Sequence, residues 1–169
     1  MRWRGTCYRG HDPRWAWTPL SGAGAAIRGG RFNPKGVPAL YLALTLSGVF
    51  VEMGHGFGHA LDALTICSYE VDVDDIVDLR TDADRKREGV GLDALSGAWI
   101  DTPSTPPSWM VAQRFIDGGA AGLLVPSFAT GATADMANLV LWTWGPDRPH
   151  RIEVHDPSGR LPKNDLSWT

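Results

Sequence analysis

Glycine and proline are the residues that most limit what this chain can fold into. The 169 residues include 20 glycines and 12 prolines. Proline removes a backbone donor and glycine weakens a helix. A chain with so many interruptions favours short elements and frequent turns over long helices. Because one domain commonly contains roughly 100–200 residues, we expect a single domain over residues 1–169.

The composition is that of a globular protein in water. Hydrophobic residues make up 43% of the chain, charged residues make up 21%, and the mean hydropathy is −0.16. No uncharged apolar run reaches the roughly 18 residues of a membrane helix, and no apolar stretch follows residues 1–5 as a signal peptide requires. We therefore expect no membrane contact and a cytoplasmic location. Cys7 and Cys67 are too few for a disulfide framework, so we expect both to be reduced and buried.

Charge is distributed unevenly, although the net charge is only −3. This balance argues against general nucleic-acid binding, which favours a basic surface, and we expect no direct nucleic-acid partner. Residues 1–36 carry seven arginines and lysines against Asp12 alone. Arginine predominates, and its planar guanidinium binds phosphate or carboxylate in a fork. Arginine codons favoured by a GC-rich genome explain the number of arginines as well as an anionic ligand does, but they explain the clustering of the arginines less well. The N-terminal segment is suited to an anionic ligand.

Strands predominate among the predicted elements. Apolar and β-branched runs bounded by turn residues predict strands over residues 37–43, 64–71, 76–79, 122–125, 138–144 and 151–155. Residues 1–36 are predicted to be irregular, and residues 81–90 to be a charged, exposed stretch. Short strands with short helices favour an α+β fold with a compact, mostly antiparallel β core and flanking helices.

Two helices are predicted. Ser108 is expected to cap one of them, which Gly118 ends. Thr45 is expected to cap the other. At 100° per residue, Glu52 lies about 115° from the centre of that helix's apolar stripe, at the border between core and cleft. The stripe, which we expect to face the core, consists of Leu46, Val49, Phe50, Met53 and Phe57.

Several common site types are excluded or disfavoured. Residues 22–27 begin like a dinucleotide-binding fingerprint, but they follow no apolar strand and no acidic residue lies about 20 positions later. No segment has the sequence of a phosphate-binding loop. His55 and His59 have the i, i+4 spacing of metal ligands, but two intervening glycines favour a solvated helix end, and we expect no metal. Ser127 lacks the flanking glycines of a hydrolase nucleophile.

The remaining candidate residues have a characteristic order. Arg9, Arg31, Tyr41, Glu52 and Ser127 each have an ordinary structural explanation, but together they resemble the RES domain family, which is named after an arginine, a glutamate and a serine. The resemblance extends over nearly the whole chain, from Tyr8–Arg9 to residues 151–155. Phe32 departs from the family, which often has tryptophan there. The segments that carry the resemblance are GGRFNP at 29–34, PALYLA at 38–43 and GLLVPS at 122–127.

This resemblance implies a fold and an activity. RES proteins are toxins of type II toxin–antitoxin pairs, and their fold is similar to that of ADP-ribosyltransferases. It implies that NAD+ is a substrate, cleaved at its nicotinamide–ribose bond to deplete NAD+ and arrest growth, and that no cofactor is needed. It also implies an Xre-like antitoxin, which we expect to block the active site. The catalytic positions match Arg31, Tyr41 and Glu52, and the NAD+-binding positions match Arg9, Arg31, Tyr41 and Ser127.

The residue types suit this reaction. A fixed carboxylate, which we assign to Glu52, stabilises the oxocarbenium-like ribose. Arg31, beside glycines whose amides would approach phosphate, is expected to bind the pyrophosphate with help from Arg9. Tyr41 is expected to stack on a substrate ring and to hydrogen-bond through its hydroxyl. Ser127 is expected to hold a ribose hydroxyl or the nicotinamide amide.

Three functions stay open at this point. The first is an NAD+-destroying toxin in which water or phosphate accepts the ADP-ribose. The second is a mono-ADP-ribosyltransferase that uses the same pocket and requires a protein acceptor. The third is a non-catalytic interaction module, in which Glu52 is an ordinary surface residue.

Overall fold

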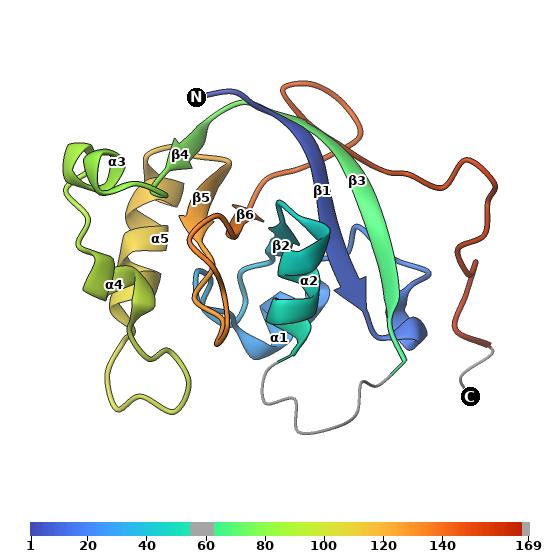
Figure 1. Cartoon of the computed structure of the whole chain (residues 1–169), viewed down its shortest axis with the longest axis horizontal. Coiled ribbons are helices and arrows are strands. Elements are labelled where there is room, and N and C mark those ends of the chain that lie inside the picture. Colours follow the sequence, from blue (N-terminus) through green and yellow to red (C-terminus); the bar gives the residue numbers. More distant parts are fainter. Residues whose placement is uncertain (55–62, 167–169) are drawn as a thin grey trace.

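The described residues, 1–54 and 63–166 of a computed structural model, form a seven-stranded mixed sheet with short helices beside it (Figure 1). The strand order is β4-β5-β6-β2-β1-β3-β7. Among the paired strands of the described residues, β4–β5 is the one parallel pair, which confirms the predicted α+β fold with mostly antiparallel pairing. The strands are β1 (Trp3–His11), β2 (Leu40–Ala43), β3 (Thr65–Val73), β4 (Ile76–Asp78), β5 (Gly122–Pro126), β6 (Ala137–Leu141) and β7 (His150–Val154).

Strand β1 overturns the prediction that residues 1–36 are irregular. It is nine residues long and pairs with β3 along its whole length, from Trp3↔Val73 to His11↔Thr65. The strand is hidden in the sequence because its glycines, arginines and partly buried residues follow no apolar alternation. Pairing with long β3, rather than its own hydrophobic pattern, makes this segment a strand.

The helices are short, as the glycine and proline content predicts. Thr45 Oγ1 accepts a hydrogen bond from Gly48 N at 3.1 Å, so the predicted cap is confirmed. Ser108 is not a cap, because Pro106 occupies the cap position and Ser108 lies in the first turn. The predicted exposed stretch at 81–90 contains a helix. The helices are α1 (Ala23–Arg28), α2 (Leu46–Met53), α3 (Asp82–Arg87), α4 (Leu92–Ser96) and α5 (Pro107–Asp117), with a 3₁₀ turn at Pro13–Trp15.

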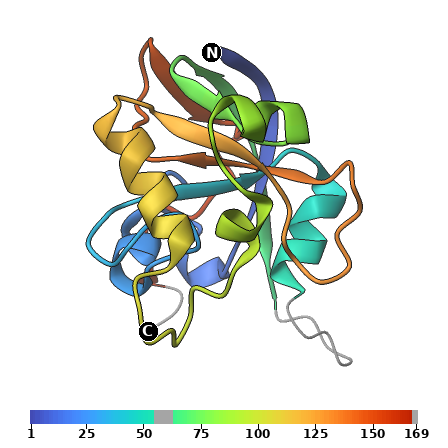
Figure 2. The same ribbon diagram turned by 90° about the vertical axis from the view of Figure 1, so that its left-hand side faces the viewer.

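The core is divided between two faces of the sheet. In β6, Leu139 and Leu141 belong to one apolar cluster and Val140 belongs to the other, because successive side chains of a strand point to opposite faces. Ala112 and Phe115 of α5 pack into the second cluster, and Figure 2 shows α5 running along this side of the sheet. No helix in the described part of the chain is long and apolar enough to span a membrane.

Candidate functional site

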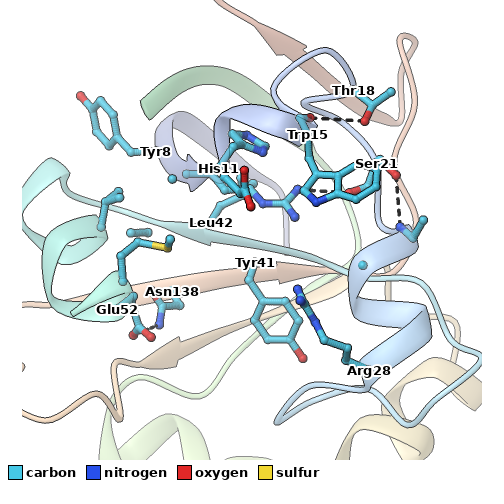
Figure 3. Close-up of a pocket in the computed structure, with 18 of the residues that line it drawn as sticks. Tyr8, His11, Trp15, Thr18, Ser21, Arg28, Tyr41, Leu42, Glu52 and Asn138 are labelled. Atoms are coloured by element: carbon cyan, nitrogen blue, oxygen red, sulfur yellow. Dashed lines mark hydrogen bonds between the residues drawn. The ribbon is translucent and has the colours of Figure 1, made fainter. Parts of the chain in front are cut away.

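A cleft with two lobes lies where β1, β2, β6, α1 and α2 meet (Figure 3). We define the large lobe as the cavity of about 800 Å³ that contains Trp15 and Trp17. We define the small lobe as the cavity of about 360 Å³ that contains Arg31 and Phe128. The two lobes meet at a waist, whose residues line both of them. The waist consists of Arg9, Gly24, Arg28, Tyr41, Glu52 and Asn138.

Helix α2 brings Glu52 to the waist by a different rotation from the one predicted. Of the predicted stripe, Val49 is buried, whereas Leu46, Phe50 and Met53 are 48%, 44% and 40% exposed, and Phe57 lies outside the described residues. The helix packs through this valine and through a buried glycine at position 48. Since Glu52 lies about 60° from Val49 on a helical wheel, its carboxylate is on the packed side of the helix and faces the cleft.

Two donors hold one oxygen of the Glu52 carboxylate. Oε1 accepts hydrogen bonds from Ser127 Oγ at 2.5 Å and from Asn138 Nδ2 at 2.6 Å. Both donors belong to the β5–β6 hairpin, in which Ser127 N donates to Met136 O at 2.9 Å. Oε2 has no hydrogen-bond partner within residues 1–54 and 63–166. The carboxylate is therefore oriented from one side and open on the other.

Asn138 is a site residue that the sequence analysis missed. It pairs in the sheet with Ala43 of β2 and with Val125 of β5. The only signal in the sequence is an amide side chain at the beginning of an otherwise apolar strand. Without the register of three strands, that signal does not connect Asn138 with Glu52.

Arg31 lines the small lobe, and backbone carbonyl oxygens hold its guanidinium. Its Nη1 donates to the carbonyl oxygens of Leu95, Ser96 and Gly97 at 3.2, 3.0 and 2.7 Å, at the C-terminal end of α4. Its guanidinium carbon lies 5.2 Å from the centroid of the Phe128 ring. Burial lowers the pKa of Arg31, and the nearby negative charge of Glu52 acts in the opposite direction. Both predicted residues line the small lobe.

The hydroxyl of Tyr41 is hydrogen-bonded within the protein. Its Oη donates to Asn33 Oδ1 at 2.7 Å and accepts from Phe32 N at 2.9 Å. Because its single proton is committed to Asn33, the hydroxyl does not donate to a substrate while that bond is formed. The ring of Tyr41 still lines both lobes.

The glycines before Arg31 also differ from expectation. Gly29 N donates to Ala25 O at 2.8 Å, and Gly30 N donates to Asn33 O at 2.9 Å. These amides close the turn around Arg31 and are not free for a phosphate. Their contribution is steric, since a Cβ on Gly30 would lie 2.4 Å from Tyr41 Oη.

Arg9 lies on β1 at the waist, and its Nη1 donates to Ser21 O at 3.2 Å. Burial lowers its pKa, which means that its charge is poorly solvated. Neither Arg9 nor Arg31 forms an ion pair in the part of the chain that the structure describes. Exposed Arg28 lies beside Tyr41 in the cleft (Figure 3). Three arginines therefore line the small lobe, which suits an anion.

His11 lies on β1 two residues after Arg9 and lines the large lobe. It is buried, and its Nε2 lies 2.6 Å from Tyr69 Oη. Because Tyr69 gives its proton to Pro19 O at 3.0 Å, we assign the donor role in the first contact to His11. Burial and the charge of Arg9 lower the pKa of His11 to about 4, so the ring is neutral near pH 7.

The predicted residues converge in the structure. Arg9, Arg31, Tyr41 and Glu52 line the small lobe, and Ser127 contacts the carboxylate of Glu52. The predicted histidine pair at positions 55 and 59 lies outside the described residues.

Comparisons with known proteins find a family model and solved structures that match this chain. The family model described as RES domain matches residues 6–164. The structure is similar to the crystal structure of the M. tuberculosis MbcT–MbcA toxin–antitoxin complex, in which the matching chain is 28% identical. That match has a TM-score of 0.59 and covers 92% of this chain and 84% of the other. A search of curated proteins found no match.

Proposed function

Since this chain belongs to the RES domain family, we propose that it is the toxin of a toxin–antitoxin pair and acts by cleaving NAD+ between nicotinamide and ribose. The observation that carries the proposal is the Glu52 carboxylate, held by Ser127 and Asn138 at the waist of a cleft lined by Arg9 and Arg31. The similarity to a toxin–antitoxin complex supports the biological role.

Glu52 is assigned to the bond-breaking step, in which positive charge develops on the ribose. When the bond between C1′ and the pyridinium nitrogen breaks, its electron pair goes to the nitrogen, and nicotinamide leaves uncharged. Positive charge then develops on the ribose, where a fixed carboxylate stabilises it. Because nicotinamide departs neutral, no strong general acid is required. Water or phosphate then forms the new C1′–O bond and releases a proton to solvent.

The arginines supply binding and orientation. NAD+ carries a pyrophosphate, and guanidinium groups without acidic partners bind such an anion well. Burial costs an arginine part of its hydration, and an anionic ligand restores a favourable environment for that charge. Arg31 and Arg9 are therefore assigned to the pyrophosphate, and Ser127 is assigned to the carboxylate rather than directly to the substrate.

Nicotinamide release tests the proposal. Purified protein, freed from any partner, is incubated with NAD+, and free nicotinamide and ADP-ribose are measured. We expect Glu52→Ala to lower kcat by about 10²–10³-fold, the range for removal of one electrostatic stabiliser. Exposed Glu153, on β7 and outside the cleft, provides the matched control Glu153→Ala, which should retain wild-type rates.

Two further observations separate the alternatives. Labelled NAD+ mixed with total cell protein should yield free ADP-ribose, whereas labelled protein would favour the transferase. In cells, expression should stop growth and lower NAD+, and Glu52→Ala should relieve both effects. A folded Glu52→Ala protein that depletes NAD+ at the wild-type rate would overturn the catalytic assignment.

The antitoxin partner follows from the same proposal. A toxin that consumes NAD+ must be restrained in its own cell, and an Xre-like antitoxin that covers the cleft would do so. We expect that adding such a partner protects NAD+ in the assay above.

A further inference from the structure

The large lobe contains two exposed tryptophans that the proposed chemistry does not use. Trp15 is 55% exposed and Trp17 is 37% exposed. Both line the cavity together with the aromatic ring of Tyr8 and the apolar side chain of Ile27. Exposed apolar side chains gathered at a cavity commonly mark a ligand site.

The segment that carries these rings is tied down. Arg9 donates to the carbonyl oxygens of Pro19 and Ser21 at 3.5 and 3.2 Å, and Tyr69 also donates to Pro19 O. Trp144 Nε1 donates to the next carbonyl, that of residue 20, at 3.0 Å. These bonds join residues 19–21 to β1, β3 and the residues after β6. Within the segment, Thr18 N donates to Trp15 O at 3.1 Å and Ser21 N donates to Thr18 O at 2.9 Å, so residues 15–21 form a preformed platform.

The two sides of the large lobe differ in chemistry. In Figure 3, Glu52 and Asn138 of the waist lie on one side of this lobe, Trp15 lies on the opposite side, and Tyr41 lies between them. Arg9, which belongs to the waist, is bonded to the platform itself. Across the large lobe, the Glu52 carboxylate is therefore followed by the Arg9 guanidinium and then by the aromatic surface of the platform.

We propose that Trp15 and Trp17 form the subsite for the adenine of the dinucleotide. This assignment rests on the proposed function. If the scissile bond lies at Glu52 and the pyrophosphate lies near Arg9, the half of NAD+ beyond the pyrophosphate extends into the large lobe. Adenine is a flat, uncharged base that stacks on indole. The large lobe thus selects a dinucleotide over a mononucleotide.

Two substrates test this subsite. NAD+ and nicotinamide mononucleotide share the bond that is cleaved, but only NAD+ carries adenine. For the double variant Trp15→Ala/Trp17→Ala we expect the KM for NAD+ to rise about 5- to 100-fold, from the effect of removing base–aromatic stacking. The KM for the mononucleotide should stay within about twofold of wild type, because no adenine is lost from that complex. The double variant Trp15→Phe/Trp17→Phe should recover most of the affinity for NAD+.

Competition with AMP supplies a second readout, which requires no cleavage of the mononucleotide. AMP should inhibit the wild type and should inhibit the double alanine variant more weakly by a similar factor. Met110→Ala changes an exposed apolar residue of α5 outside the cleft, and it should match wild type in every assay.

The two proposals fail in different ways. A wild-type protein that releases nicotinamide from neither substrate contradicts the proposed function. A wild-type protein that cleaves NAD+, paired with an alanine variant whose KM for NAD+ and inhibition by AMP are unchanged, overturns the adenine subsite. Equal losses on NAD+ and on the mononucleotide would also overturn it.

Discussion

Glu52 has two inequivalent oxygens, and this asymmetry is set by Asn138 and Ser127. Both donors bind Oε1, so the rotation of the carboxylate is determined by the β5–β6 hairpin. We expect Oε2 to be the oxygen that faces the substrate. A residue that orients a reacting group affects the rate more than the binding of substrate, because it places the group for the transition state.

Asn138→Ala should therefore lower kcat for NAD+ by about 10–100-fold, with a KM within about threefold, as for other supporting residues. Steady-state kinetics of nicotinamide release measure both constants. Thr133→Ala removes a hydrogen bond to Asp135 in the same hairpin without touching Glu52, and it is expected to leave both constants unchanged.

Asn138→Asp provides a readout that a purely structural role would not change. Two carboxylates in contact share one proton at low pH and repel each other once both are ionised. Activity of this variant should fall as the pH rises through that titration, whereas wild type should lack this dependence. Matching pH profiles for the two proteins would argue against contact between residues 52 and 138.

At the scale of elements, the turn before β2 is what places Arg31. Asn33 is fully buried, and its Nδ2 donates to the carbonyl oxygens of Ala25 and Val37 at 3.0 and 2.8 Å. Trp109 Nε1 and Trp142 Nε1 donate to carbonyl oxygens of the same turn at 2.7 and 2.9 Å. Because so many side chains hold this backbone, the turn is rigid and it presents the guanidinium in one direction.

Gly30→Ala should disrupt this turn. The new Cβ would lie 2.4 Å from Tyr41 Oη and 2.5 Å from Asn33 Oδ1, so the turn must shift. We expect a loss of about 1–3 kcal/mol in the free energy of unfolding, the usual cost of overpacking. Nicotinamide release should fall as well, since Arg31 follows directly.

Gly24→Ala in α1 is the control for Gly30→Ala in the measurement of stability. Its Cβ would meet only Arg28 Nη2 at 3.6 Å, an ordinary contact. Replacing a helical glycine by alanine should stabilise the protein by about 0.4–1 kcal/mol. Urea unfolding of both variants compares the two positions, and equal stabilities would contradict the account of the turn.

At the scale of the whole molecule, burial of His11 makes stability depend on pH. Its pKa falls from an unfolded value near 6.5 to about 4 in the folded protein. Between these values the unfolded chain binds a proton and the folded protein does not. The contribution of neutral His11 to the free energy of unfolding is therefore fully present above pH 6.5 and is lost as the pH falls to about 4. The shift corresponds to about 3 kcal/mol.

Unfolding by urea across this pH range, for wild type and His11→Gln, measures the effect. Glutamine keeps a donor for Tyr69 but does not titrate, so the difference in stability between the two proteins should narrow or reverse as the pH falls. The carboxylates titrate in both proteins and cancel in the comparison. A constant difference between pH 7 and pH 4 would show that His11 is not buried in the neutral form.

The sequence predicts much of this molecule for a local reason. Glycine and proline interrupt the chain, and apolar runs locate β2–β7 to within a few residues. The Thr45 cap and the predominance of antiparallel strands also follow from neighbouring residues. These features are local because backbone geometry and burial of a short segment depend on residues a few positions apart.

Local sequence patterns did not predict three features: strand β1, the rotation of α2 and the role of Asn138. β1 carries cleft-facing arginine and histidine in place of an alternating apolar pattern, so it is a strand only because β3 pairs with it. The exposed residues Leu46 and Phe50 of α2 resemble a buried stripe until the contact through Val49 is known.

The sequence by itself determined the short elements, the α+β class and the order of the five candidate residues, through which the RES family can be identified. Only the tertiary structure decided that Glu52 is held by Ser127 and Asn138, which lie 75 and 86 positions away. It also decided that the Tyr41 hydroxyl and the amides of Gly29 and Gly30 are hydrogen-bonded within and around the turn that contains Arg31. The reason is physical: a hydrogen bond depends on distance in space, and distance in space between remote segments depends on how the whole sheet pairs.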